Sequence, residues 1–203
     1  MSKKQNVTIG GYAEILSGHA VVSREKRTEG SFSYAVVVPA QLTPDGLVGE
    51  LGILLRETPY TENQLLRRGD VLVKRLNPDG AVVILDEIPP TVLSTNLFAI
   101  RPKPGLDSNY LAFLLESTNL LNHIAQLSGT GTTIAAISGS QIAAAEIPLI
   151  PFEEQRNFGE FWRLAKRRKL LLKRYISANE RLLRAMGENL RKKEKGSTNG
   201  NDH

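Results

Sequence analysis

The chain has 203 residues, of which 41% are hydrophobic and 23% charged, and it contains no cysteine. This length suits one folded domain with an appended element, and the composition is that of a globular protein. The lack of cysteine excludes a disulfide framework, cysteine-based zinc sites and thiol catalysis. No apolar run resembles a signal peptide or approaches the roughly 20 residues of a membrane span, so we expect a cytoplasmic protein.

The net charge of +5 is unevenly distributed along the chain. Residues 156–195 contain 14 Lys or Arg against 4 Glu, whereas residues 1–155 contain 12 Lys or Arg against 16 Asp or Glu. The pI near 9.5 would by itself indicate nucleic-acid binding. Because residues 1–155 are mildly acidic, any DNA contact in that part must come from local basic patches.

Residues 1–152 are predicted to form one α+β domain of short mixed strands and small helices. Its strands are expected where short, mostly β-branched runs are bounded by Gly, Pro, Asp or Asn, at 35–38, 71–73, 81–85 and 97–100. The Asn-Pro-Asp-Gly stretch at 77–80 predicts a turn, because Pro presets φ, Asp bonds the local backbone and Gly adopts a positive φ. Residues 70–85 are therefore expected to form a β-hairpin.

Two helical segments and an extended connector are predicted next along the chain. Apolar residues have helical spacing over 108–127, with Ser108 as the candidate N-cap and Asn119 as a candidate break. A short helix capped by Ser138 is predicted over 138–145. The Ile-Pro-Leu-Ile-Pro stretch at 147–151 is expected to be extended, because its prolines are incompatible with a helix interior.

After Pro151 the pattern predicts one long helix over 153–192, followed by a disordered tail at 193–203. Two series of positions, each repeating every seven residues and the second offset by four, form a seam in which eight of ten residues are apolar. A polar residue in such a seam, here Asn179, fixes the alignment of the paired helices at some cost in stability. The seam consists of Phe158, Ala165, Leu172, Asn179 and Met186 in the first series and Trp162, Lys169, Ile176, Leu183 and Leu190 in the second.

A helix of this extent would be roughly 60 Å long, too long for a domain of this size to cover. We therefore predict that the seam, apart from Lys169, forms the interface of a homodimer. The alternative is a monomer whose amphipathic helix lies on its own domain. The basic cluster between Arg163 and Arg174 is more often a solvated face than a strip that contacts DNA.

The sequence contains no recognisable catalytic arrangement. It lacks an adenosylmethionine-binding loop, a P-loop and a nuclease-like acidic pair followed by Lys. Residues 77–80 share only their first two residues with the Asn-Pro-Pro-aromatic loop by which methyltransferases hold an amine. The histidines, His19, His123 and His203, have no metal-ligand spacing. We therefore predict a protein that is not an enzyme and has no cofactor or metal site of its own.

The segment 132–156, TTIAAISGSQIAAAEIPLIPFEEQR, resembles the closing signature of the target-recognition domain in specificity (S) subunits of type I restriction–modification systems. In that family a Gly/Ser/Thr-rich loop leads to an Ile-Ser helix start, a small helix and an Ile-Pro-Leu-Pro-Pro-type strand, and a Glu-Gln pair then opens a long helix. Ile150 replaces one of these prolines. Upstream, 10–18, 69–73, 94–100 and 110–115 match family segments in the same order, so the resemblance covers nearly the whole chain.

The resemblance implies a subunit that reads DNA and directs other subunits. In this family, S binds methyltransferase (M) subunits, which carry adenosylmethionine and the adenine-methylating chemistry, and a motor-nuclease (R) subunit joins where restriction occurs. Full-length S subunits usually have two recognition domains and two long helices paired antiparallel, whereas this chain has one of each. It resembles a half-subunit, and two copies would place two identical readers on a bipartite, palindromic target.

Candidate DNA-binding residues are polar, lie on predicted loops or strand ends, and are outside the seam. Phosphate contacts position such a protein, and contacts to base edges give specificity. The family motif transfers no base-contacting residues, because the recognition loops vary within the family. The candidates are Arg24, Lys26, Arg27, Arg56, Lys74, Arg75, Thr130, Thr132 and Thr133.

Three other interpretations remain open from the sequence. The first is a coiled-coil scaffold of the same fold that does not read DNA, which the acidic first 155 residues favour. The second is a stand-alone nuclease, which lacks an identifiable catalytic site. The third is a chain that pairs with a different half-subunit.

Overall fold

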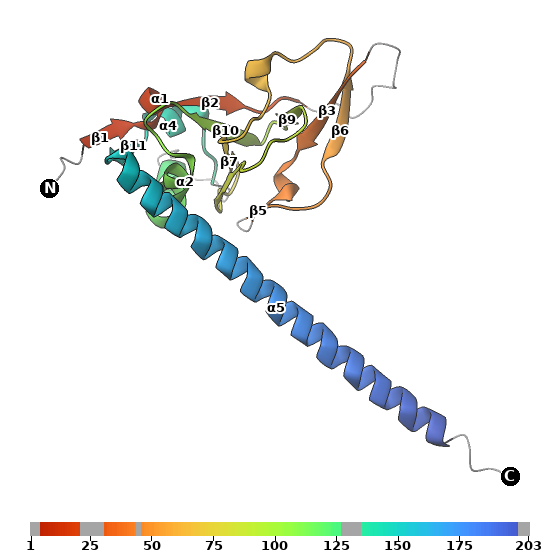
Figure 1. The fold of residues 1–203 in the computed structure, drawn as a ribbon. Coiled ribbons are helices and arrows are strands. Elements are labelled where there is room, and N and C mark those ends of the chain that lie inside the picture. The colour runs from red at the N-terminus through yellow and green to blue at the C-terminus, as the bar shows by residue number, and fades with distance from the viewer. Residues whose placement is uncertain (1–4, 21–30, 44–45, 127–134, 199–203) are drawn as a thin grey trace. The chain divides into compact units, whose positions relative to one another are not determined.

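The computed structural model describes residues 5–20, 31–43, 46–126 and 135–198 (Figure 1), with side chains as far as Arg191. The chain divides into two compact units, Met1–Arg163 and Leu164–His203. The first unit contains strands and short helices, and the described part of the second is helical. The predicted α+β class with a long C-terminal helix is therefore confirmed.

A four-stranded antiparallel sheet lies at the centre of the first unit. Its order is β2 (Ala13–Ser17), β10 (Leu97–Pro102), β7 (Val71–Lys74) and β8 (Ala81–Val83). Strands β7 and β8 form the predicted hairpin, with Val71 opposite Val83. In its turn the positive φ is at Asn77, with 46°, and not at Gly80 as predicted. Asn tolerates this conformation because its short polar side chain can bond the local backbone.

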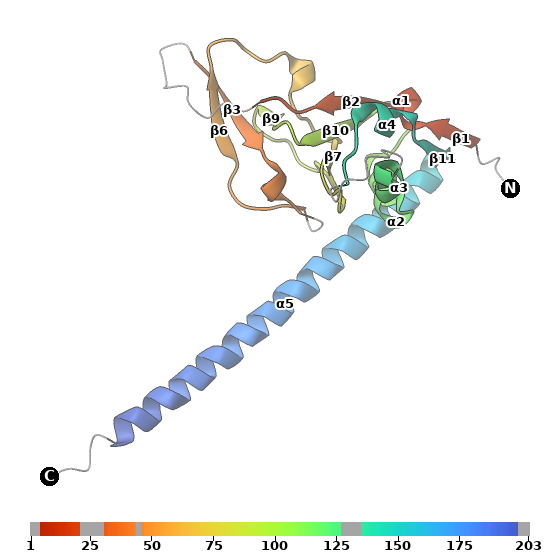
Figure 2. The same cartoon turned by 180° about the vertical axis from the view of Figure 1, so that it is seen from behind.

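A second sheet lies beside the first, as Figures 1 and 2 show from opposite sides. Its order is β6 (Gly52–Arg56), β3 (Phe32–Val37) and β9 (Thr91–Leu93). Strand β3 pairs antiparallel with β6 and parallel with β9. Short elements complete this part: η1 (Pro39–Gln41), β4 (Leu42–Thr43), β5 (Gly46–Leu47) and η2 (Glu62–Gln64).

The predicted extended connector is a strand that pairs with the start of the described chain. It forms β11 (Glu146–Leu149), antiparallel to β1 (Gln5–Thr8), with Val7 opposite Ile147. The helix α1 (Ile9–Tyr12) follows β1, and the Ile9 amide donates to the Ala145 carbonyl at 2.9 Å. This pairing fixes the segment that leads into the long helix.

The helices of the first unit match the predicted segments, with one difference at a cap. Asn119, with φ of 57°, separates α2 (Ser108–Ser117) from α3 (Leu120–Gln126), so the predicted break is confirmed. Ser138 caps α4 (Gly139–Ala144) as predicted, accepting from the Gln141 amide at 3.2 Å. The N-cap of α2 is Asp107 and not Ser108. The hydroxyl of Ser108 instead donates to the Gly69 carbonyl at 2.7 Å.

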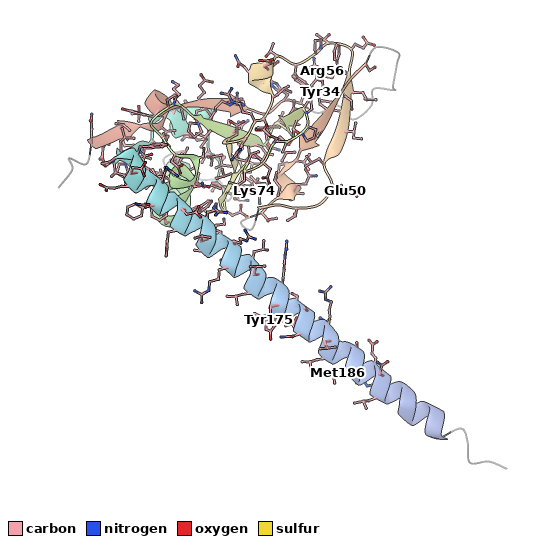
Figure 3. The ribbon with its side chains drawn as sticks, viewed as in Figure 1. Tyr34, Glu50, Arg56, Lys74, Tyr175 and Met186 are labelled. Carbon is pink, nitrogen blue, oxygen red and sulfur yellow. The ribbon has the colours of Figure 1, made fainter. Side chains whose placement is uncertain are left out.

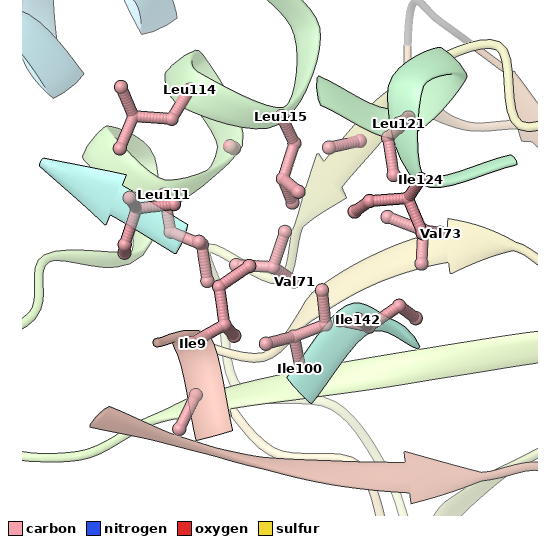
Figure 4. Close-up of a cluster of buried hydrophobic side chains, with 14 of the residues drawn as sticks. Ile9, Val71, Val73, Ile100, Leu111, Leu114, Leu115, Leu121, Ile124 and Ile142 are labelled. Carbon is pink, nitrogen blue, oxygen red and sulfur yellow. The ribbon is translucent and has the colours of Figure 1, made fainter. Parts of the chain in front are cut away.

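The four-stranded sheet is covered on both faces. One face packs against α2, α3 and α4, which contribute the labelled side chains of Figure 4 together with Ile9 of α1 and Val71, Val73 and Ile100 of the sheet. The alternate residues Leu72 and Leu97 belong to a separate buried cluster on the other face. Because both faces are buried, the central strands β10 and β7 have continuous apolar runs, whereas the edge strand β2 has Glu14 and Ser17 exposed.

A buried ion pair connects the segment before β7 to β10. The Arg101 Nε and Nη2 atoms donate to Asp70 Oδ1 and Oδ2, both at 2.8 Å. Arg101 Nη2 also donates to the Leu65 carbonyl at 2.7 Å, and the Arg67 amide donates to Asp70 Oδ2 at 2.9 Å. Asp70 and Arg101 are 0% and 3% exposed. Both oxygens of the Asp70 carboxylate thus accept hydrogen bonds, as a charge removed from water requires.

The long helix α5 runs from Phe152 to Thr198. It extends beyond the predicted end at residue 192. Its first residues belong to the first unit, because the units divide after Arg163. Considered by itself, the described part of the second unit is a helix on which Leu172, Ile176 and Leu183 are 52%, 56% and 68% exposed. None of the helices described is both long and apolar enough to span a bilayer.

The buried pair provides the first prediction. Asp70→Asn should lower the free energy of unfolding by about 3–5 kcal/mol, because it leaves Arg101 buried without its counter-charge. The matched control is Asp79→Asn, which removes the 3.0 Å surface pair with Lys74, where Asp79 is 48% exposed, and which should cost less than about 1 kcal/mol. Urea unfolding followed by the fluorescence of Trp162, the chain's one tryptophan, measures both. Equal losses in the two variants would contradict the prediction.

Candidate nucleic-acid interface

Three segments leave the central sheet at the same end. Strand β2 ends, β10 begins and β7 ends there: the Gly18 amide donates to the Leu97 carbonyl at 3.1 Å, and Leu97 lies opposite Lys74. Adjacent strands are about 4.8 Å apart, so the ends of β2 and β7 lie roughly 10 Å from each other. The segments that follow these two strands are therefore neighbours, although they are far apart in the sequence.

Lys74 and Arg75, two of the sequence-predicted residues, lie at this end of the sheet. Lys74 is the last residue of β7 and pairs with Asp79 across the hairpin turn at 3.0 Å. Arg75 follows it, is exposed, and its amide donates to the Asn96 carbonyl at 2.9 Å. The side chain of Lys74 is thus partly neutralised, whereas that of Arg75 projects from a backbone that the sheet holds in place.

The end of the Gly/Thr-rich segment is bound to the same hairpin. The Asn77 amide donates to the Ala135 carbonyl at 2.7 Å, and the Ile137 amide donates to the Arg75 carbonyl at 2.9 Å. The predicted residues in that segment, Thr130, Thr132 and Thr133, lie outside the described residues. In the sequence they shortly precede Ala135, whose carbonyl accepts from the hairpin residue Asn77.

Arg56 lies in a group of aromatic rings at the end of β6. Its Cζ atom is 4.3 Å from the centroid of the Tyr60 ring. Tyr60 is itself fixed, because its amide donates to the Tyr34 hydroxyl at 3.0 Å and the two rings meet edge to face at 5.0 Å. The ring of His19 lies 5.3 Å from that of Tyr60. We call His19, Tyr34, Arg56 and Tyr60 the Arg56 cluster.

The Arg56 cluster adjoins the other segment of predicted residues. Arg56 lies opposite Phe32, the first residue of β3, and His19 follows the end of β2. Residues 21–30 connect these two strands and carry Arg24, Lys26 and Arg27, which lie outside the described residues. Figure 3 shows Arg56 beside Tyr34 and well apart from Lys74. The described candidates therefore form two patches, and His19, which follows the end of β2, is the member of the Arg56 cluster that comes from the end of the central sheet.

Sequence reasoning left His19 without a role, and the structure gives it a place in the site. The His19 amide donates to the Leu93 carbonyl at 2.8 Å, and His19 forms a β-bridge with Ser94. The preceding Gly18 is required by this approach, since a Cβ atom there would lie 1.8 Å from the Ser94 carbonyl oxygen. The Ser-Gly pair at 17–18 was the sequence signal for this close passage, although it did not identify Tyr60 as the neighbour.

The two patches contain side chains of the kinds that proteins use to bind nucleic acids. A guanidinium presents a planar fork that matches the O6 and N7 acceptors of guanine, and stacking on a ring limits its motion. Exposed cations at the edge of a sheet fit phosphate contacts, which position a protein without reading sequence. Within residues 5–20, 31–43, 46–126 and 135–191, no three His, Asp or Glu side chains are placed to hold a metal.

Gln155 anchors the first turns of α5 to the first unit. Its Nε2 donates to the carbonyls of Gly105 at 3.0 Å and Ile150 at 2.8 Å, and its Oε1 accepts from the Asp107 amide at 3.0 Å. The side chain is 1% exposed. Gly159 allows the close approach that follows, because a Cβ there would be 2.7 Å from Asp107 Oδ1. Within the Glu-Gln pair at 154–155, Gln155 thus has a structural role.

Two residues of the predicted seam also contact the first unit of their own chain. The Phe158 ring stacks on Phe113 at 5.7 Å while Phe158 stays 47% exposed. The Trp162 Nε1 donates to Glu116 Oε2 at 3.0 Å, and Glu116 Oε1 accepts from the Ala81 amide at 2.9 Å. The pairing of Phe158 and Trp162 with a second copy stays a prediction.

Tyr110 also holds the segment that leads into α5. Its hydroxyl donates to the Pro148 carbonyl at 2.8 Å. Burial raises the pKa of this phenol, and the nearby carboxylate of Glu154 raises it further. Tyr110 therefore keeps its proton, and this hydrogen bond, throughout the neutral pH range.

Residues 1–162 match the family model described as the type I restriction modification DNA specificity domain. The type I restriction enzyme MjaIX specificity subunit of Methanocaldococcus jannaschii is 28% identical to this chain over 108 residues. That alignment covers 53% of this chain and 24% of the relative. The chain thus spans about a quarter of the relative's length.

Two solved structures share the fold. The HsdS subunit from Thermoanaerobacter tengcongensis aligns with a TM-score of 0.58 over 84% of this chain and 39% of its own, at 24% identity. A chain from a structural study of complex assembly and conformational transition of the type I R-M system aligns with a TM-score of 0.60. It covers 90% of this chain and 43% of its own, at 19% identity. The chain therefore spans about two fifths of each.

The contacts of Gln155 provide the second prediction. Gln155→Glu should lower the free energy of unfolding at neutral pH by at least about 2–3 kcal/mol, because a carboxylate oxygen would face two carbonyl oxygens with no donor between them. Arg156→Gln, at a neighbouring position whose side chain is 61% exposed, is the matched control and should be near neutral. Urea unfolding followed by Trp162 fluorescence measures both.

The loss of stability caused by Gln155→Glu should also depend on pH. The introduced carboxyl is favoured in its protonated form by the two carbonyls, so its pKa in the folded state lies above its unfolded value. The deficit of Gln155→Glu relative to the unmodified chain should therefore shrink as the pH falls through that raised pKa. A deficit that stays constant between pH 7.5 and about 5 would contradict the proposed geometry.

Proposed function

Because this chain belongs to the type I restriction modification DNA specificity domain family, we propose that it is the non-catalytic subunit that reads DNA sequence in such a system. The observation that carries the proposal is the family match over residues 1–162, together with two patches that contain cations at the ends of strands β6 and β7. In such a system this chain would recognise the DNA sequence, and other subunits would catalyse the reactions.

The two patches have different proposed roles. Arg56 is proposed to contact base edges, because its guanidinium is stacked on Tyr60 at 4.3 Å and is only partly exposed. A side chain that is already ordered loses less conformational entropy when it binds. Lys74 and Arg75 are proposed to contact phosphates, with Arg24, Lys26, Arg27 and Thr130, Thr132 and Thr133 on the two adjoining segments.

The helix is proposed to bring two copies together. Between Ala165 and Leu190 its apolar seam is exposed within its own unit, and burying such side chains between two chains is favourable by about 25 cal/mol per Å² of apolar area. A two-fold pair would hold two identical recognition domains, so the target would be bipartite and palindromic. Sedimentation of the pure protein separates this homodimer from a monomer or from a chain that waits for a different half-subunit.

The catalytic partners are proposed by analogy with the family. The M subunit would carry adenosylmethionine and methylate adenine, and an R subunit would join where restriction occurs. The faces of α5 outside the seam, including the basic stretch between Arg163 and Arg174, are the proposed docking surface for M.

A second candidate function is a scaffold that kept this fold but does not read sequence. The acidic composition of residues 1–155 favours it, because an acidic surface repels the phosphate backbone. Selection from random DNA in the presence of M distinguishes the two functions. Enrichment of a palindromic bipartite motif supports the reader, and no enrichment supports the scaffold.

The two patches provide the third prediction. In that selection, Arg56→Gln should relax one base-pair position in each half-site, where discrimination falls by about 1–3 kcal/mol. Arg75→Gln should instead weaken binding to all sequences alike and reduce the slope of log K against log salt by about 1 for each half-site. Arg68→Gln is the matched control, since Arg68 is exposed and precedes β7 at the opposite end of the sheet. A uniform loss in Arg56→Gln would remove its proposed role as a base reader.

The division of labour provides the fourth prediction. Purified chain with labelled adenosylmethionine and target DNA should transfer no methyl groups, and transfer should begin when M is added. Incorporation of label into DNA measures this directly. The control is M with DNA that lacks the selected motif, which should stay unmethylated. Methyl transfer by the chain alone would refute the proposal.

A further inference from the structure

The geometry of the seam points to one register of pairing. We propose that two copies of α5 pair antiparallel so that Lys169 of each copy meets Asn179 of the other. This inference rests on the proposed homodimer and adds to it a specific alignment of the two helices. It makes the two polar residues of the seam partners of one another.

The seam has two polar interruptions in an otherwise apolar surface. Lys169 and Asn179 belong to the two different series of the seam, and Leu172 and Ile176 lie between them. Met186 and Leu190 continue the seam and are 55% and 65% exposed, with Met186 labelled on the helix in Figure 3. A polar group that is buried against apolar side chains without a hydrogen bond is unfavourable. The alignment that lets Lys169 and Asn179 face each other avoids this loss.

One antiparallel alignment satisfies every position of the seam. In antiparallel helices, a step forward on one chain is a step back on the other, so a single facing pair determines all the others. Setting Leu172 opposite Ile176 of the second copy places Lys169 opposite Asn179. The remaining pairs are then Ala165 with Leu183, Trp162 with Met186, and Phe158 with Leu190, which are all apolar.

Slips by one heptad produce mismatches. In one direction Lys169 faces Leu172 and Asn179 faces Trp162. In the other direction Lys169 faces Met186 and Asn179 faces Ile176. Both slips shorten the overlap of the two seams, and the two-fold symmetry repeats each mismatch. The proposed register is therefore favoured over its nearest competitors by several unpaired polar groups.

A parallel pair is disfavoured by charge. It would place Lys169 opposite Lys169 at the centre of the seam, with two ammonium groups competing for the same space. In the antiparallel register, the Lys169 ammonium donates to the Asn179 amide oxygen of the second copy. One polar pair of this kind in a coiled coil is known to select register and orientation at some cost in stability.

Charges beside the seam disfavour one of the two slips. In the proposed register Lys166 lies beside Glu180 of the second copy, an opposite-charge pair that the two-fold axis repeats, and Lys173 lies beside Lys173 of the second copy. In the slip that sets Lys169 against Leu172, Lys166 would instead lie beside Lys173 twice. The slip that sets Lys169 against Met186 pairs Lys173 with Glu180, so only the polar residues of the seam disfavour it.

The absence of cysteine from the chain allows the register to be measured by disulfide crosslinking. A disulfide needs Cα atoms within about 7 Å, and a slip of one heptad moves residues by about 10 Å. Ala165→Cys with Leu183→Cys reports the proposed register. Ala165→Cys with Ile176→Cys and Ala165→Cys with Leu190→Cys report the two slips. Ala165→Cys alone reports a parallel pair.

We expect the 165/183 variant to give at least about tenfold more crosslinked dimer on a non-reducing gel than any other variant, because a single unpaired buried polar group suffices for that ratio. Predominant crosslinking of a slip variant, or of Ala165→Cys alone, overturns the register while the homodimer stands. Sedimentation of the reduced variants as monomers, without crosslinking of any variant, overturns the proposed homodimer and the register with it.

A second set of variants tests the role of the polar pair. Lys169→Leu combined with Asn179→Leu removes the penalty for slipping, so adding this change to each cysteine variant should bring all three antiparallel crosslinks within about threefold of one another. Persistence of the 165/183 crosslink as the one product would show that the polar pair does not select the register. Lys169→Gln with Asn179 retained is the control, because Gln can still pair with Asn, and it should keep the 165/183 preference.

Discussion

Asp70 and Arg101 hold β7 and β10 together below the surface, and the candidate DNA-binding surface depends on this alignment. A charged guanidinium that is 3% exposed is tolerable only with its counter-ion in place. The carboxylate also accepts from the Arg67 backbone, and the guanidinium reaches the carbonyl of Leu65, so the approach to β7 has one conformation. Strand β7 is four residues long, and therefore the position of Lys74 and Arg75 at its other end follows from where Asp70 is held.

Local patterns in the sequence predicted several of the elements, although β6 and β9 were not predicted, and long-range pairing decided the details. The β7–β8 hairpin, the break at Asn119 and the cap at Ser138 each depend on residues within a few positions of one another. The N-cap of α2 was assigned wrongly, because the Ser108 hydroxyl bonds Gly69, which is distant in sequence. The parallel pairing of β3 with β9 and the pairing of β1 with β11 also join distant segments, and no local pattern signals them.

In the candidate site, too, local sequence predicted some residues, and contacts between distant segments added the others. Arg56, Lys74 and Arg75 were selected as cations on predicted loops or strand ends, and all three lie where strands end, although β6 itself was not predicted. The sequence contained no signal that Arg56 would stack on Tyr60 or that His19 would join them, since these contacts come from three separate strands and loops. The residues that carry the family resemblance are mostly architectural: Asp70 and Gln155 are buried, and Gly18 permits a close backbone contact. This is why the resemblance identifies the family and leaves the DNA target open.

Glu116 is shared between two elements, one carboxylate oxygen for each. One oxygen accepts from the backbone of Ala81 at the start of β8, and the other accepts from the indole of Trp162 on α5. A shift of the hairpin relative to the helix cannot keep both bonds at their present lengths. A displacement of the start of β8 would therefore be transmitted to Trp162 on α5 through the Glu116 carboxylate, in addition to the contacts of Gln155 and Phe158.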